Sequence, residues 1–228
     1  AWPNVFVMAL LHSLAVCGAL CLPHIHWATL VYLYVLKLIG TMGVQVGAHR
    51  LWAHRSFKAN YGLRLALSLA FVLALQNTLY EWVRDHRTHH KHSDTDADPH
   101  NRERGFFFSH IGWLLVRKHP EIFRQAVLLN LDNLKADPVV MFQRKFYIPL
   151  AVLLFDLLPT FIPVFCWNER IVTSFVFCVA FRYILTLHVT WLVNSWAHSM
   201  GRRPYNAKIA PVEASVRHVL VGEGFHNY

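Results

Sequence analysis

The chain has 228 residues, of which 55% are hydrophobic, and it carries a formal net charge of +9. This composition is more apolar than that of an ordinary soluble domain and favours a membrane protein. Of the 22 Lys and Arg residues, 15 lie between His49 and Lys145 and four follow Gly201. Nucleic acid therefore explains the basicity poorly, whereas the positive-inside rule places both basic stretches on the cytoplasmic side.

Neither the cysteines nor the amino terminus shows a recognisable functional motif. The four cysteines lie in or beside apolar runs, without a metal-type pairing, and we interpret them as small hydrophobic residues. The chain does not begin with Met, and its first apolar run has neither a basic leader nor a small-residue cleavage site. We therefore do not interpret this run as a signal peptide, and we expect the amino terminus to be truncated.

Four apolar stretches reach the roughly 20 residues that a transmembrane helix needs. The predicted spans are residues 2–22, 27–48, 146–167 and 171–197. Short links, PHIH at 23–26 and NER at 168–170, join the spans pairwise, so neither link has room for a folded domain. The sequence therefore predicts an all-α membrane protein with four transmembrane helices in two hairpins.

A fifth apolar stretch, residues 63–79, contains Arg64, Gln76 and Asn77, and its hydropathy alone is ambiguous. Histidine clusters stand on both sides of it. A membrane crossing here would put those clusters in opposite compartments, so we predict an interfacial or buried helix instead. Residues 49–145 and 198–228 then form a cytosolic helical cap, and the whole chain, residues 1–228, forms a single domain.

Charged residues inside the predicted spans need partners. Lys37 lies 12 residues before His49 and Asp156 lies 11 after Lys145, so both sit roughly 16 to 18 Å from the cap. We hypothesise that they form an ion pair. The alternative is that Lys37 extends its ammonium group along the bundle toward water.

Histidine is concentrated in the motifs HRLWAH, HRTHHKH, NSWAH and GEGFHNY. Neutral imidazole suits divalent transition metals, and i, i+3 and i+4 spacing on a helix lets His86, His89 and His90 face one centre. His49 and His54 are five residues apart, which is about 140° on an α-helix, so they require a helix end between them or metals on different sides. So many imidazoles exceed the four ligands of one zinc and favour two metals.

The remaining histidines are more typical of core or interface positions, because a lone histidine in an apolar segment is seldom a ligand. His92 and His100 are intermediate cases. The core or interface group comprises His12, His24, His26, His110, His119, His188 and His218.

Longer motifs reveal a resemblance. GAHRLWAHRSFKA, QNTLYEWVRDHRTHHKHSDTDADPHN, RGFFFSHIGWLLVRKHP, VMFQRKFY, TWLVNSWAH and VGEGFHNY occur in this order and cover most of the chain. Here the sequence closely resembles the membrane-bound acyl-CoA desaturases, the stearoyl-CoA desaturase family that includes the insect fatty-acyl-CoA desaturases. The resemblance implies four spans under a cytosolic cap that holds two irons, with an acyl tunnel entering from the cap.

The resemblance also assigns metal ligands. The family's third histidine box reads HNYHH, whereas this chain stops at HNY, so two expected ligands are missing and we expect the fragment as given to be inactive. The implied iron ligands are His49, His54, His86, His89, His90, His198 and His226, with Asn194 acting through a water.

The resemblance further implies substrate contacts. The acyl-CoA head group would lie near Asn77, Arg84, Asp85, Arg117 and Lys118, and Gln76, Trp82, Thr190 and Trp191 would shape the tunnel where the acyl chain bends. Arg and Lys suit phosphates, and aromatic walls suit an alkyl chain. Alternatively, Arg117 and Lys118 form a basic face at the membrane surface, and the two tryptophans are core or interfacial residues.

Two residues depart from the family pattern. Lys37 stands toward the tunnel's end, where relatives usually carry an uncharged residue, and His92 replaces an aromatic residue. Ligand histidines also need acceptors that fix their tautomers. The nearby candidates are Glu81, Asp85, Asp94 and Asp96, although Asp94, Asp96 and Asp98 also suit turn positions before Pro99.

The implied reaction inserts a cis double bond into a saturated acyl-CoA, using O2, two Fe2+ ions and two electrons. The chain has no flavin or haem motif, and the resemblance implies cytochrome b5 and its reductase as donors at the endoplasmic reticulum membrane. An acidic donor would suit a basic cap.

Three other functions compete with desaturation. They are a histidine-rich di-iron membrane hydroxylase acting on a lipid, a non-catalytic membrane receptor or transporter with bound zinc, and a hydrolase that uses zinc-activated water. The acyl-CoA-type motifs favour desaturation over the hydroxylase. Double-bond position and chain-length preference depend on sub-ångström placement and lie outside sequence reasoning.

Overall fold

A computed structural model describes residues 1–207, 211–215 and 223. Its contacts divide the chain into two compact units. The span unit comprises Met8–His86 and Asn130–Thr186, and the loop unit comprises Ala1–Val7, Arg87–Leu129 and Leu187–Tyr228.

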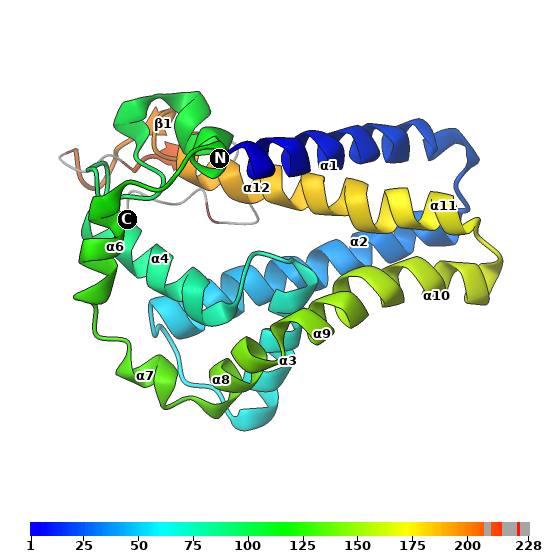
Figure 1. Cartoon of the computed structure of the whole chain (residues 1–228), viewed down its shortest axis with the longest axis horizontal. Coiled ribbons are helices and arrows are strands. Elements are labelled where there is room, and N and C mark those ends of the chain that lie inside the picture. Colours follow the sequence, from blue (N-terminus) through cyan, green and yellow to red (C-terminus); the bar gives the residue numbers. More distant parts are fainter. Residues whose placement is uncertain (208–210, 216–222, 224–228) are drawn as a thin grey trace. The chain divides into compact units, whose positions relative to one another are not determined.

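Four apolar helices in the described residues are long enough to cross a membrane, which confirms the predicted spans (Figure 1). They run over Trp2–Leu20, Trp27–Ala53, Tyr147–Trp167 and Ile171–Ser195. The second continues five residues past its predicted end at 48. The first span is α1 (Trp2–Leu20), and the second joins α2 (Trp27–Met42) to η2 (Gly43–Ala53). The third consists of α9 (Tyr147–Ala151), η5 (Val152–Leu157) and α10 (Leu158–Trp167). The fourth consists of α11 (Ile171–Ser174), η6 (Phe175–Phe181) and α12 (Arg182–Ser195).

The two interhelical links lie against each other in the span unit. The first link contains the short helix η1 (Leu22–His24), and the second begins at Asn168, whose φ of 58° ends α10. The buried Glu169 carboxylate accepts hydrogen bonds from the His26 backbone N–H (3.1 Å) and the Thr29 hydroxyl (2.7 Å). One carboxylate thus joins both hairpins at their linked ends.

The ambiguous fifth stretch forms α3 (Tyr61–Leu73), which has 13 residues. At 1.5 Å per residue it extends about 20 Å, which is short of the roughly 30 Å hydrocarbon core. The Asn60 side chain caps its start by accepting from the Leu63 N–H at 2.9 Å. Gly43 of η2 packs directly on the α3 backbone at Ala70 and Phe71, where a Cβ atom would collide.

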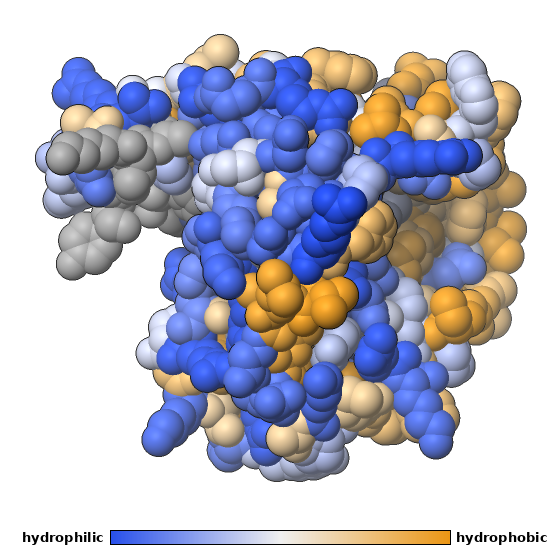
Figure 2. Space-filling model, turned by 60° about the vertical axis from the view of Figure 1, so that its left-hand side comes forward, coloured by the Kyte–Doolittle hydropathy of each residue, from blue (hydrophilic) through white to orange (hydrophobic). Residues whose placement is uncertain are grey.

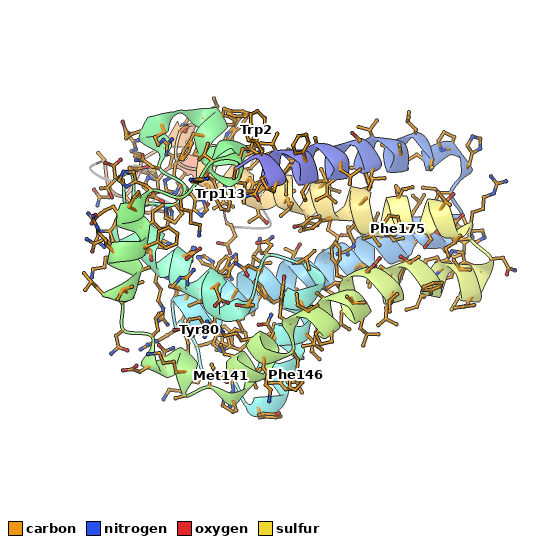
Figure 3. The ribbon with its side chains drawn as sticks, in the orientation of Figure 1. Trp2, Tyr80, Trp113, Met141, Phe146 and Phe175 are labelled. Atoms are coloured by element: carbon orange, nitrogen blue, oxygen red, sulfur yellow. The ribbon has the colours of Figure 1, made fainter. Side chains whose placement is uncertain are left out.

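The segment that leads into the third span forms short helices. In the span unit, these are α7 (Asp132–Lys135) and α8 (Pro138–Lys145). Asp137 caps α8 and also accepts from Trp52 Nε1 (3.0 Å) and Arg64 (2.9 Å). Figure 3 labels Met141 in α8 and Tyr80 in α4 (Leu79–Lys91), and Arg144 stacks 4.1 Å above the Tyr80 ring.

The loop unit holds short elements around the end of α12. They are η3 (Arg102–Arg104), η4 (Phe108–Gly112), α5 (Trp113–Leu115), α6 (Pro120–Val127) and the antiparallel strands β1 (Gly201–Arg202) and β2 (Glu213–Ala214). Ala214 packs with Ala197 against Val193 and Trp196, and the Ala1 ammonium donates to the Leu115 carbonyl at 2.8 Å.

Apolar side chains remain exposed along the spans. Phe6, Leu10 and Val16 of α1 are 70, 60 and 59% exposed, and Figure 2 shows such hydrophobic surface beside hydrophilic surface. Contiguous apolar surface of this kind on helices of spanning length is typical of contact with lipid.

The hypothesised ion pair between Lys37 and Asp156 is not supported. Both side chains are described and partly buried, yet they make no contact within the 4.0 Å limit for an ion pair. Equal depth from the cap does not determine which face of its helix a side chain occupies. An ion pair also requires that the two side chains point toward each other. The partial burial of Lys37 agrees with the alternative of an ammonium group that extends along the bundle.

Replacing Gly43 by Ala should destabilise the protein, because the added methyl group meets the α3 backbone. We expect a loss of about 1–3 kcal/mol, seen as a lower melting temperature in detergent. The matched control is Gly62→Ala in α3, where the nearest atom is 3.7 Å away. Equal melting temperatures for the two variants would contradict the packing described.

Candidate metal centre

The π-helical geometry of η2 brings His49 and His54 together. The His54 N–H donates to the His49 carbonyl at 2.9 Å, an i→i+5 bond, and His54 stands at the end of the helix. Residues five apart diverge on an α-helix but close one turn of a π-helix, a form often found at functional sites. The spacing that looked unfavourable in sequence is thus explained by a wider turn and a helix end.

His86 of α4 completes a group of three imidazoles in the span unit. The ring centroids are 4.5 Å apart for His49 and His54, 4.8 Å for His49 and His86, and 5.3 Å for His54 and His86. The Nε2 atoms of His54 and His86 lie 3.2 Å apart. Ligand nitrogens about 2.1 Å from one metal ion lie roughly 3 to 4 Å from each other, so this donor set fits a transition metal.

Trp82 orients His86. The indole ring stacks on the imidazole with centroids 4.7 Å apart and planes inclined by 15°, and it lies one turn earlier on α4. Trp82 Nε1 donates to Gln76 Oε1 at 3.3 Å, and Phe71 meets the indole edge-on at 6.1 Å. Of the residues that the sequence analysis assigned to the tunnel, Trp82 therefore packs on His86, and Gln76 hydrogen-bonds to Trp82.

Two of the three histidines predicted to share one face of α4, His86 and His89, have different neighbours. His86 joins His49 and His54, whereas His89 lies in the loop unit, with its ring 5.3 Å from that of the buried His198. His90 is one turn after His86 on the same helix.

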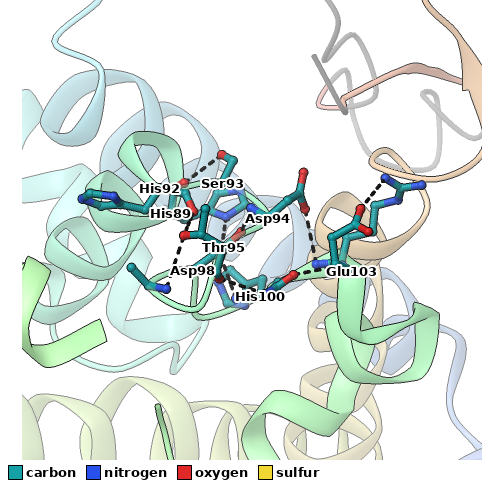
Figure 4. Close-up of polar contacts among 11 residues, drawn as sticks. His89, His92, Ser93, Asp94, Thr95, Asp98, His100 and Glu103 are labelled. Carbon is teal, nitrogen blue, oxygen red and sulfur yellow. Dashed lines mark hydrogen bonds and ion pairs between the residues drawn. The ribbon is translucent and has the colours of Figure 1, made fainter. Parts of the chain in front are cut away.

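Asp98 fixes the orientation of His89. Its Oδ1 accepts from His89 Nδ1 at 2.7 Å and from the His100 N–H at 2.8 Å, while Oδ2 accepts from the Asp94 N–H at 2.8 Å (Figure 4). Burial alone would raise the pKa of Asp98, but the hydrogen bond and charge of His89 and the charge of His100 hold this pKa below its usual value. The carboxylate keeps the proton on Nδ1, so Nε2 of the neutral ring carries the lone pair that a metal would need.

The acceptor for His89 is therefore not among the four candidates named from sequence. Glu81 forms an ion pair with Arg144 at 2.7 Å, and Asp85 forms one with Arg84 at 2.8 Å. Asp94 accepts from the Arg102 N–H at 3.3 Å. Asp98 had been considered only as a turn residue, and it serves both purposes, because the turn that it closes also points its carboxylate at His89.

The predicted head-group residues fall into two sets. Asn77, Arg84 and Asp85 lie in the span unit, on α4 and the turn before it. Arg117 and Lys118 lie in the loop unit, where they line a surface recess together with Arg104 and Trp113. The loop-unit set joins cationic and aromatic groups, a combination that can bind a phosphate beside a planar ring.

Trp191 is enclosed by two histidines that the sequence analysis treated as core residues. Its ring lies 5.8 Å from that of His110 and 5.1 Å from that of His188. The Ser195 hydroxyl donates to the Trp191 carbonyl and so accepts from His110 Nδ1, which leaves His110 Nε2 to accept from His188 Nδ1 at 3.0 Å. Burial lowers the pKa of the His110 imidazole below its usual value.

Helical spacing in the sequence could have predicted the contact of Trp191 with His188 but not its contact with His110. His188 precedes Trp191 by three residues on α12 and therefore shares its face, but His110 is 81 residues away in sequence. Thr190 and Asn194 also lie on α12, which ends at Ser195, so His198 follows in the next turn. His226, a predicted ligand, and His218 lie outside the described residues.

Comparisons with known proteins identify the family. A family model described as fatty acid desaturase matches residues 25–228. The chain belongs to the fatty acid desaturase family. Its sequence is 50% identical to an acyl-CoA desaturase of Cyprinus carpio and to a stearoyl-CoA desaturase of Sus scrofa, and 48% identical to a delta(9)-fatty-acid desaturase of Caenorhabditis elegans. The matches cover the whole chain and 70, 64 and 68% of these relatives, respectively.

Asp98→Asn tests how this desaturase-family chain orients a ligand. The amide keeps an oxygen for the His89 N–H but loses the charge, so we expect metal affinity to fall by about 10-fold to 100-fold. Competition with a chelator measures the affinity. Asp132→Asn is the control, since that side chain is 78% exposed. Unchanged affinity in Asp98→Asn would show that Asp98 does not act on a metal ligand.

Proposed function

We propose that this chain is the catalytic core of an acyl-CoA desaturase, which inserts a cis double bond into a saturated fatty acyl-CoA. The observation that carries the proposal is the convergence of His49, His54 and His86 in a chain of this family with apolar helices of spanning length. The relatives named above are acyl-CoA, stearoyl-CoA and delta(9)-fatty-acid desaturases, which supports the same substrate class here.

We propose two Fe2+ ions as the bound metals. The ligands would be His49, His54, His86, His89, His90, His198 and His226, with Asn194 acting through a water. Iron bound here would supply the oxidising power, drawn from O2, that removal of hydrogen from an unactivated methylene group requires. The donor chemistry fits, because neutral imidazole binds iron and the His89 tautomer is fixed by Asp98.

The chain's own residues would hold and bend the substrate. Trp82 and Trp191 offer flat apolar walls, and Gln76 and Thr190 offer polar groups beside them. The head group would contact Asn77, Arg84, Asp85, Arg117 and Lys118. Precise positioning and exclusion of water are the protein's main contributions to such a reaction.

The distribution of basic residues supports a location and an orientation in the membrane. We place the protein in the endoplasmic reticulum membrane with residues 49–145 and 198–228 toward the cytosol, because the basic residues gather in these segments. Cytochrome b5 and its reductase would deliver the electrons to this basic side, and membrane lipid would surround the exposed apolar helices.

Changing one clustered histidine should reduce iron binding. We expect His86→Ala, in protein expressed from its complete coding sequence, to lose at least one of about two irons per chain, as measured by elemental analysis. His24→Ala is the matched control, because His24 is exposed in the first interhelical link. A single zinc per chain in the unmodified protein would favour the zinc receptor or hydrolase instead.

Oxygen dependence separates desaturation from hydrolysis. With purified protein, reductant and saturated acyl-CoA, we expect an unsaturated product only when O2 is present, with about one O2 consumed per double bond. A hydrolase would release product anaerobically, and a hydroxylase would leave an alcohol that mass spectrometry detects as an added oxygen atom.

A further inference from the structure

The short connection between α3 and α4, residues 74–78, has an unusual backbone. Leu75 and Asn77 both adopt positive φ, 48° and 75°, although neither is glycine. This left-handed region is sparsely populated by such residues and persists only where the surroundings fix it. The connection carries Gln76, which accepts from Trp82 Nε1, and Trp82 stacks on His86. Its conformation therefore bears on both the proposed tunnel and the metal group.

Arg182 holds the start of this connection from within the fourth span. The guanidinium is 1% exposed and donates through Nη1 to the Leu73 carbonyl at 2.9 Å. Its other bonds go to the carbonyls of Cys178 (2.6 Å) and Phe155 (3.5 Å). The last carbonyls of a helix lack partners within it and carry partial negative charge, so the end of α3 is a suitable acceptor for a buried cation.

Tyr183, the next residue, holds the strained position itself. Its hydroxyl donates to the Leu75 carbonyl at 3.2 Å. At the far end of the connection, the buried Gln143 accepts from the Leu79 N–H at 3.0 Å and fixes the start of α4. Side chains from α12 and α8 thus bond to backbone groups on both sides of Gln76.

We propose that Arg182 and Tyr183 are positioning residues that set where the acyl chain bends relative to the metal group. They act through the 74–78 connection, which places Gln76, and through Gln76 on Trp82 and His86. This inference rests on the proposed desaturase function and deepens it, because it assigns control of the double-bond position to residues that bond to backbone carbonyls around the 74–78 connection.

Tyr183→Phe is the primary test, since it removes one hydrogen bond and keeps the ring. In protein expressed from its complete coding sequence, we expect the minor positional isomers among the unsaturated products to rise roughly threefold to tenfold, as expected for the loss of one hydrogen bond. We expect Kd for stearoyl-CoA, titrated by tryptophan fluorescence, to weaken by a similar factor. Iron content should be unchanged.

Tyr34→Phe is the matched control, because Tyr34 lies in the second span and is 58% exposed. Equal isomer ratios and equal Kd for the two variants would overturn the inference. A lower melting temperature in Tyr183→Phe without a change in either quantity would mean a merely structural role and would also overturn it. Absence of unsaturated product from the unmodified protein would instead overturn the proposed function, while Kd still reports on the positioning of the ligand.

Arg182→Lys extends the test. Lysine keeps the charge but lacks the planar fork, so it cannot hold three carbonyls in the same geometry. We expect a larger isomer shift than in Tyr183→Phe, with Arg170→Lys, at an exposed position, as the control. An unchanged isomer ratio in folded Arg182→Lys contradicts the inference. If Arg182→Lys does not fold, the isomer ratio of Tyr183→Phe decides the test.

Discussion

The close approach of imidazole nitrogens in the span unit is the interaction on which the rest of this site depends. His54 and His86 face each other across 3.2 Å through their Nε2 atoms, and His49 stands beside both. Two neutral nitrogen lone pairs at this distance need a proton or a metal between them. Bringing them together requires the π-helical turn of η2, the contact of Gly43 with α3, and a connection that returns the chain as α4. The bundle can thus be understood as a scaffold for these nitrogens.

Each histidine group is held by neighbours of a different kind. Stacking on Trp82 restrains His86, whereas a buried carboxylate restrains His89 through its Nδ1 proton. The first contact is apolar and the second is electrostatic, yet both fix the orientation of a ring. Asp98 itself is stabilised by two backbone N–H groups, and this compensates for the burial of its charge.

Hydropathy predicted the spans, because they depend on local composition. The non-spanning α3 was predicted instead from the histidine clusters on both sides of it, since its own hydropathy was ambiguous. Contacts between distant segments were not predictable in this way. The partner of His89 lay in a loop that looked like an ordinary turn, His110 meets Trp191 across 81 residues of sequence, and the proposed pair of Lys37 and Asp156 failed because depth does not determine facing. Arg182 is the clearest case, since its partners are backbone carbonyls that no sequence pattern marks.

The buried guanidinium of Arg182 links the fourth span to the end of α3, because its Nη1 donates to the Leu73 carbonyl directly before the connection that carries Gln76. The most direct test is mass-spectrometric location of double bonds in lipids from desaturase-deficient yeast that express the complete coding sequence. We predict new unsaturated acyl chains with one predominant double-bond position, and verified expression without any new unsaturated product would contradict the proposed function.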